Sequence, residues 1–123
     1  MMIGNDIVKI DRMQKIYENE RLLNRIFTKE EQEYINSASS MQVRFERMAG
    51  KIAVKEAVAK AFGVGIANEL SWLDIKTTHK ESGKPAIIKT QPIMLLLKKS
   101  GLEDIDVSIS HMDNYATAVC LVF

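Results

Sequence analysis

One carboxylate lies in the middle of an apolar helical stripe. The segment from Ser39 to Ile66 has the pattern of a long helix, in which Glu56 shares a face with apolar residues and Lys60 follows one turn later. Lys51 and Lys55 point to the opposite side of this helix. The apolar residues beside Glu56 are Phe45, Ala49, Ile52 and Ala53. Because burying an unpaired carboxylate is costly, Glu56 needs a nearby cation or a proton.

A second carboxylate has a similar setting near the N-terminus. The run from Met2 to Ile10 alternates as a strand and places Asp6 on the same face as Val8. If the long helix packs on this strand, Asp6 and Glu56 meet, and two adjoining acids either share a proton or bind a divalent cation. Mg²⁺ takes one or two carboxylates and adds waters and substrate phosphates, so the pair favours phosphoryl chemistry. The alternative is that Glu56 pairs with Lys60 while Asp6 ends a strand or caps a turn.

Other positions give less specific signals. Gly63-Val64-Gly65 follows a helix, whereas phosphate-cradling loops precede one, so it indicates a helix stop and no P-loop. His111, at the mouth of a predicted hairpin, could donate to a phosphate or carry a proton; an exposed turn histidine is an equal alternative. His79 is expected at the surface, and Cys120 is expected to pack as a small hydrophobe. No motif in the sequence supplies an enzyme nucleophile or a zinc site.

Periodicity and capping signals predict the elements that must position these residues. Asp11 and Ser39 are expected N-caps, Thr28 with Glu31 forms a capping-box pattern, and Gly63 follows the end of the long helix. We expect helices at 11–18, 20–25, 28–36, 39–62 and 93–99, and strands at 2–10, 71–79, 85–89, 106–110 and 115–122. Together they predict an α+β fold, a compact single domain over residues 1–123 with an antiparallel sheet packed on a long central helix.

Composition narrows the class of partner. The 123 residues are 46% hydrophobic and 27% charged with a net charge of +1, so there is no basic footprint for nucleic acid. No apolar run approaches the roughly 18 residues of a membrane span, and a signal-peptide pattern is absent, so we expect a cytoplasmic protein with no membrane contact. Residues 9–29 carry six basic and three acidic side chains, a patch suited to an acidic partner. The last predicted strand is apolar on both faces, which predicts an oligomer.

Taken together, several blocks closely resemble the family of holo-acyl-carrier-protein synthases, the small bacterial-type 4′-phosphopantetheinyl transferases. The similarity runs in order along nearly the whole chain. The blocks that carry it are Gly4-Asn5-Asp6-Ile7-Val8, Met48 to Ala57, Lys60 to Ile66, Gly83-Lys84-Pro85 and Val107-Ser108-Ile109-Ser110-His111.

The resemblance implies a phosphopantetheinyl transferase of fatty acid biosynthesis. Its reaction would be the Mg²⁺-dependent transfer of the phosphopantetheine arm of coenzyme A to a serine of apo acyl carrier protein, which releases adenosine 3′,5′-bisphosphate. Asp6 and Glu56 match the metal-binding acids, and Glu56 and Lys60 match the catalytic residues. The implied coenzyme A-binding residues are Lys51, Lys60, Gly63, Gly65, Lys84, Pro85 and His111.

The resemblance also implies two kinds of protein partner. Arg12, Arg21 and Arg25 match positions on the first helix that face the acidic recognition helix of the carrier protein. Family members are similar in being homotrimers of α+β subunits, with each active site between two subunits. Two other interpretations remain: a non-catalytic oligomeric module that binds an acidic protein, and a Mg²⁺-dependent pyrophosphatase that cuts coenzyme A with water as acceptor.

Some positions differ from the usual family pattern. Lys51 stands where an arginine is common and loses the bidentate fork for phosphate. Met112 follows the histidine where a threonine is common, and Ala67 stands where a glycine is frequent. None of these differences removes a predicted metal ligand.

Overall fold

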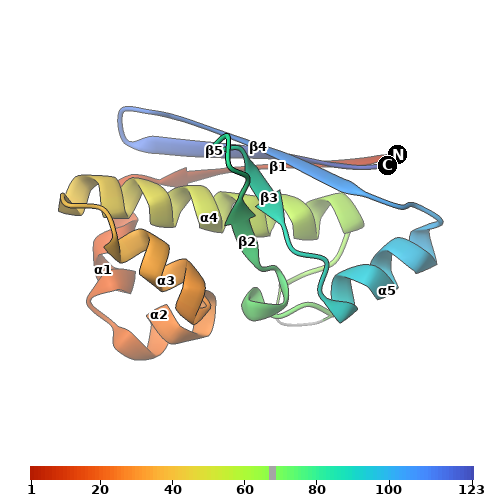
Figure 1. The fold of residues 1–123 in the computed structure, drawn as a ribbon, viewed down its shortest axis with the longest axis horizontal. Helices are drawn as coiled ribbons and strands as arrows, with labels where there is room; N and C mark the ends of the chain where they lie inside the picture. Colours follow the sequence, from red (N-terminus) through yellow and green to blue (C-terminus); the bar gives the residue numbers. More distant parts are fainter. Residues whose placement is uncertain (67–68) are drawn as a thin grey trace.

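A three-stranded antiparallel sheet lies along one side of the long helix α4 (Met41–Phe62) (Figure 1). The strand order is β1 (Met2–Lys9), β5 (Tyr115–Val122) and β4 (Ile105–Met112). β5 pairs with both neighbours, and its buried side chains alternate with more exposed ones. The computed structural model describes residues 1–66 and 69–123, so the family difference at Ala67 lies outside the described residues.

Short helices and a second, two-stranded sheet cover the other side of α4 (Figure 1). α4 is buried on both sides, which explains why its apolar residues are spread around the helix instead of forming one stripe. No helix in the two described ranges is long and apolar enough to cross a membrane. The remaining elements are η1 (Ile10–Arg12), α1 (Met13–Tyr17), α2 (Glu20–Ile26), α3 (Lys29–Asn36), η2 (Trp72–Asp74), β2 (Thr77–His79), β3 (Pro85–Ile87) and α5 (Gln91–Ser100).

β1 approaches the backbone of α4 closely at Gly4. A Cβ atom added to Gly4 would lie 2.5 Å from the backbone nitrogen of Ala61 and would overlap the carbonyl oxygen of Ala57. Only glycine fits at this contact. Because side chains alternate along a strand, Asp6 lies on the same face as Gly4, two residues further on, and therefore faces α4.

The α+β class, with an antiparallel sheet on a long central helix, is confirmed, but two of the predicted N-caps, Asp11 and Ser39, are wrong. Asp11 lies inside η1, and its backbone N–H donates to Asn114 Oδ1 at 2.9 Å. Ser40, one residue after the predicted cap, begins α4 by accepting a 3.1 Å hydrogen bond from the Val43 N–H. Adjacent serines make this boundary ambiguous in the sequence.

The predicted strand at 71–79 is also too long. The Ser71 N–H donates to the Asp74 carboxylate at 2.9 Å and closes the 3₁₀ turn η2, so that β2 begins only at Thr77. Its pairing with β3 confirms the predicted hairpin. A serine and an aspartate at this spacing satisfy the local backbone better than a strand ladder would.

The close approach at Gly4 predicts a large effect of Gly4→Ala. The added methyl group meets helix backbone that cannot turn aside, so the free energy of unfolding should fall by about 3 kcal/mol. Urea denaturation measures this change. Asn5→Ala, at the exposed neighbouring position, should stay within about 0.5 kcal/mol of wild type. A Gly4→Ala protein as stable as wild type would contradict the close approach.

Candidate active site

The structure brings Asp6, Glu56 and Lys60 together where β1 crosses α4. The Lys60 Nζ donates to Asp6 Oδ1 at 2.9 Å. The Asp6 side chain is only 14% exposed, whereas that of Lys60 is 54% exposed. All three residues line a cleft of about 420 Å³, which we call the acid cleft. Its other lining residues include Arg12 and the apolar residues Met13, Ile16, Ile26, Ile52 and Trp72.

The surroundings of Glu56 in the acid cleft oppose its ionisation. Burial raises the pKa of Glu56, and the negative charge of Asp6 raises it further, while Lys60 acts in the opposite direction. The hydrogen bond to Asp6 raises the pKa of Lys60, so this amine keeps its proton. The predicted meeting of the two acids is therefore found in the structure. Among the described residues Lys60 forms its ion pair with Asp6 rather than with Glu56, contrary to the simpler helical pairing.

The donor set of the acid cleft fits a hard divalent cation. Residues 1–66 and 69–123 contain no group of three or more His, Cys, Asp or Glu side chains that could hold a metal. Mg²⁺ does not need such a group, because it commonly binds one or two carboxylates and completes its shell with waters and phosphates. Burial first, and then the charge of Asp6, raise the pKa of Glu56, so both disfavour its ionised form; a bound cation would favour that form.

Other predicted coenzyme A-binding residues line a separate cleft. Lys51, Pro85 and His111 border a hollow of about 350 Å³, which we call the hairpin cleft; among the residues that the structure describes, none lines both this hollow and the acid cleft. At about 100° per residue, Lys51 projects roughly 140° around α4 from Glu56. The family-matched residues therefore lie on two sides of one subunit.

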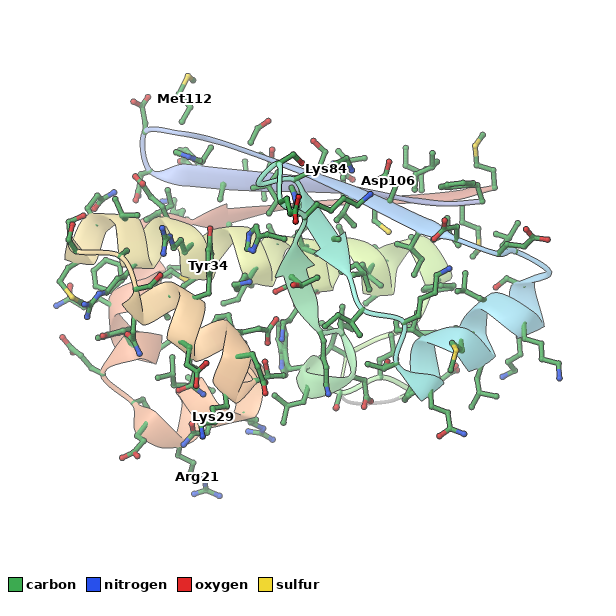
Figure 2. All side chains as sticks on the ribbon, viewed as in Figure 1. Arg21, Lys29, Tyr34, Lys84, Asp106 and Met112 are labelled. Atoms are coloured by element: carbon green, nitrogen blue, oxygen red, sulfur yellow. The ribbon has the colours of Figure 1, made fainter. Side chains whose placement is uncertain are left out.

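The remaining predicted coenzyme A-binding residues line neither cleft. Lys84 forms an ion pair with Asp106, and the two side chains meet beside β4 (Figure 2). Gly63 ends α4 in the left-handed conformation, with φ of 69°, as the helix-stop prediction required. Gly65 is exposed just beyond it.

The three predicted carrier-binding arginines are exposed, but they are not on one helix. Arg12 lies in η1 and borders the acid cleft. Arg21 and Arg25 lie on α2, where Arg21 points away from the body of the protein (Figure 2). The resemblance placed all three on the first helix, whereas the structure divides them between η1 and α2, as the separately predicted helices at 11–18 and 20–25 indicate; Asn19 caps the second of these.

His79 is only partly exposed, whereas the sequence predicts a surface residue. Its ring is half-buried against Tyr34, with ring centroids 4.2 Å apart, and it lines the hairpin cleft. Burial lowers the pKa of His79, and the nearby charges of Lys51 and Arg47 lower it further. His111 is exposed on β4 and lines the same cleft.

A buried ion pair, which the sequence did not reveal, lies about 100° around α4 from Glu56, behind the acid-cleft residues Ile26 and Trp72. Lys55 is 0% exposed, and its Nζ donates to Glu31 Oε1 at 2.8 Å and to the carbonyl oxygens of Ile26 and Trp72. The Thr28 N–H donates to Glu31 at 2.8 Å, which completes the predicted capping box. Although burial opposes ionisation, Lys55 and these hydrogen bonds hold the pKa of Glu31 below its usual value.

Helical periodicity gave the direction of Lys51 and Lys55 correctly but not their burial. Their relative exposures are 3% and 0%. The available signal was the apolar residues that flank them, Val54 and Val58, which indicate that this second side of the helix is also covered.

Comparison with known proteins identifies the class. The family model of the 4′-phosphopantetheinyl transferase superfamily matches residues 2–120. The chain belongs to this superfamily. It is 41% identical over 119 residues to a holo-[acyl-carrier-protein] synthase from Protochlamydia amoebophila, covering 94% of this chain and 92% of that one. The corresponding protein of Chloroherpeton thalassium is 40% identical over 124 residues, covering 99% and 97% of the two chains.

Solved structures of the same kind share the fold. A holo-[acyl-carrier-protein] synthase from Neisseria meningitidis superposes with a TM-score of 0.86 at 27% identity, covering 99% of this chain and 97% of that one. The Helicobacter pylori protein, solved in complex with coenzyme A, gives a TM-score of 0.83 at 32% identity and covers 99% of this chain and 100% of that one.

The raised pKa of Glu56 predicts a pH-dependent effect of Glu56→Gln. An acid whose pKa is higher in the folded than in the unfolded state destabilises the fold when ionised. Glu56→Gln should therefore increase the free energy of unfolding at pH 7, by about 1 kcal/mol or less at this partly solvated site. This gain in unfolding free energy should vanish as the pH falls below the ordinary pKa of a glutamate side chain. Urea denaturation from pH 7 to pH 4 tests this, with exposed Glu33→Gln as control; equal stability at pH 7 would contradict it.

The buried ion pair predicts different effects on stability for two lysine substitutions on one side of α4. Lys55→Met leaves the Glu31 carboxylate buried without its cation and should cost about 3–5 kcal/mol of unfolding free energy. Lys51→Met should be neutral or stabilising, because burial lowers the pKa of Lys51 to about 8 and Glu31 keeps Lys55. Urea denaturation at pH 7 compares the two. Equal losses of unfolding free energy in the two variants would contradict a stabilising role for the pairing of Lys55 with Glu31.

Proposed function

We propose that this protein transfers the 4′-phosphopantetheine arm of coenzyme A to a serine of apo acyl carrier protein. The products are the holo carrier protein and adenosine 3′,5′-bisphosphate. Family membership and the names of the relatives support this activity, as does the coenzyme A complex of the Helicobacter pylori relative. The observation that carries the proposal is the meeting of Asp6, Glu56 and Lys60 in the acid cleft.

The acid cleft has a role for each side chain in this reaction. Asp6 and Glu56 would hold Mg²⁺, which when bound neutralises pyrophosphate charge and stabilises the leaving oxygen. The carrier's serine oxygen attacks the phosphorus that bears pantetheine, the bond from this phosphorus to the bridging oxygen breaks, and Glu56 accepts the serine proton. Lys60 keeps its positive charge and stabilises the negative charge of the transition state.

The nucleophile comes from the partner in this proposal, which agrees with the lack of a nucleophile motif in the sequence. The exposed Arg12 borders the acid cleft, and Arg21 and Arg25 extend the basic surface along α2. These arginines would dock the acidic carrier and steer its serine toward Glu56. Positioning of the two substrates supplies much of the rate enhancement.

We further propose a homotrimer in which each active site lies between two subunits. Two observations support it. The outer face of the sheet leaves Ile3 70%, Ile7 63% and Val119 44% exposed, an apolar surface that a second copy would cover. The acid cleft and the hairpin cleft lie apart within one subunit, so coenzyme A can contact both sets of residues if the hairpin cleft of a neighbour completes the site.

Three broader expectations accompany this function. Residues 1–123 would form one phosphopantetheinyl transferase domain, and the reaction would serve fatty acid biosynthesis. A cytoplasmic location, where no membrane contact is needed, stays a prediction.

Mass spectrometry of apo acyl carrier protein tests the function directly. Incubation with this protein, coenzyme A and Mg²⁺ should add the mass of phosphopantetheine to the carrier, and a chelator should abolish the gain. A matched incubation without carrier separates the alternatives, because a pyrophosphatase would release the nucleotide there too. An unmodified carrier would refute the proposed function.

The combined substitution Asp6→Asn and Glu56→Gln should abolish transfer and cation binding together. Removal of both acids should lower the rate by at least about 100-fold, while Glu33→Gln should leave it unchanged. Because a ligand that binds only the folded state stabilises it, Mg²⁺ should raise the Tm of the wild type and not that of the double variant.

Two results would contradict these roles. A double variant that transfers at the wild-type rate would remove the acids from the mechanism. A protein that binds the carrier but transfers nothing, with or without the substitutions, would instead indicate a docking module.

A further inference from the structure

A buried chain of hydrogen bonds joins Glu31 to Lys51 through Thr77. The Thr77 hydroxyl donates to Glu31 Oε2 at 2.5 Å and accepts from the Lys51 Nζ at 2.7 Å. A threonine hydroxyl has one proton and two lone pairs, so it makes both bonds at once. The Thr77 backbone N–H adds a third bond, 2.9 Å long, to the same Glu31 oxygen. The hydroxyl orientation is therefore set by Glu31, and its free lone pair is directed at Lys51.

Lys51 is 3% exposed and lies in the wall between the hairpin cleft, which also contains His111, and a neighbouring hollow lined by Glu31 and Thr77. Its Nζ is 4.8 Å from the centroid of the Tyr34 ring, and no carboxylate of the described residues is within ion-pair distance. Burial lowers the pKa of Lys51 to about 8, with Glu31 acting against this shift and the cations Lys55 and Arg47 adding to it. A cation held without an ion pair beside an open cleft is suited to an anionic ligand.

A lysine side chain does not by itself hold its ammonium group at one fixed position. Its ammonium group sits on a flexible stem with four carbons and has three donors, whereas a guanidinium carries its own fixed fork. One Lys51 donor is occupied by Thr77, and the described residues accept no further hydrogen bond from Lys51, so two donors remain for a ligand. Thr77 lies on the short strand β2, and its bond to Glu31 fixes this strand to α3, so the acceptor itself cannot drift.

We propose that Thr77, oriented by Glu31, is a positioning residue that holds the Lys51 ammonium at the hairpin cleft to bind a phosphate group of the substrate. This inference rests on the proposed function, in which the hairpin cleft receives part of coenzyme A. Thr77 itself does not touch the substrate. Its contribution is to fix the cation before the ligand arrives, which reduces the ordering that binding requires.

Thr77→Val tests the proposal, because valine keeps the shape of threonine and removes the hydroxyl. Calorimetric titration with coenzyme A should show binding weakened about 5- to 20-fold. Thr77→Ser keeps the hydroxyl, so this variant should bind coenzyme A within about twofold of the wild-type affinity. Thr78→Val removes an exposed hydroxyl next along the strand and should change nothing. In the transfer assay Thr77→Val should raise KM more than it lowers kcat, as expected for a binding role.

A double-mutant cycle distinguishes the loss of the Thr77–Lys51 contact from a general loss of structure. In a Lys51→Met background the cation is already gone, so Thr77→Val should cause no further loss of coenzyme A binding. If the two effects simply multiply, Thr77 acts on the cleft by another route and the proposal is wrong.

An NMR measurement examines the same contact without substrate. At pH 6 the Lys51 ammonium protons should be protected from exchange in the wild type and in Thr77→Ser, and should lose protection in Thr77→Val. Lys55, buried on the same side of α4 and not bonded to Thr77, is the internal reference. Unchanged Lys51 protection in Thr77→Val overturns the proposal.

The binding and transfer measurements distinguish a failure of the Thr77 role from a failure of the proposed function. If wild type transfers phosphopantetheine but Thr77→Val binds coenzyme A equally well, the positioning role is wrong and the proposed function stands. If wild type neither binds coenzyme A nor modifies the carrier, the proposed function fails, and the phosphate-binding role of Lys51 fails with it.

Discussion

The approach of β1 to α4 at Gly4 is the constraint on which the acid cleft depends. Without a side chain at Gly4, strand and helix backbones come close enough for Asp6 to reach Lys60 and to influence Glu56. The resulting pair of acids is unfavourable in the protein alone, since burial and mutual repulsion raise the pKa of Glu56. Sites that bind cations or transfer protons commonly sacrifice stability in this way. The strand and helix that form the core therefore also assemble the chemistry.

The adjoining side of α4, behind the acid cleft, carries a buried polar network. There the ion pair of Lys55 with Glu31 ties α3 to the helix, and bonds from the same lysine to two carbonyl oxygens tie in α2 and η2. Thr77 extends this network to β2 and Lys51. One helix thus presents an open acidic cleft on one side and, on the other, a buried polar network that ends at a cation. These two sides would belong to different active sites in the proposed trimer.

The sequence predicted the parts of the fold that depend on local signals. The alternation of β1, the Thr28 capping box and the stop at Gly63 all lie where expected, because neighbouring residues determine them. The meeting of Asp6 with Glu56 also followed from periodicity, once the helix was assumed to pack on the sheet. The burial of Lys55 did not follow, because its partner Glu31 is 24 residues away and already explained as a cap. Tertiary contacts of this range leave little trace in one sequence.

The central claim is that Asp6 and Glu56 form one electrostatic unit ready for a divalent cation. An NMR titration of the Glu56 side-chain carboxyl carbon tests it most directly, in wild type, in Asp6→Asn and with Mg²⁺ present. The account predicts a raised pKa in wild type, a lower one in Asp6→Asn, and a marked fall when Mg²⁺ is added. A Glu56 that titrates identically in all three samples would contradict it.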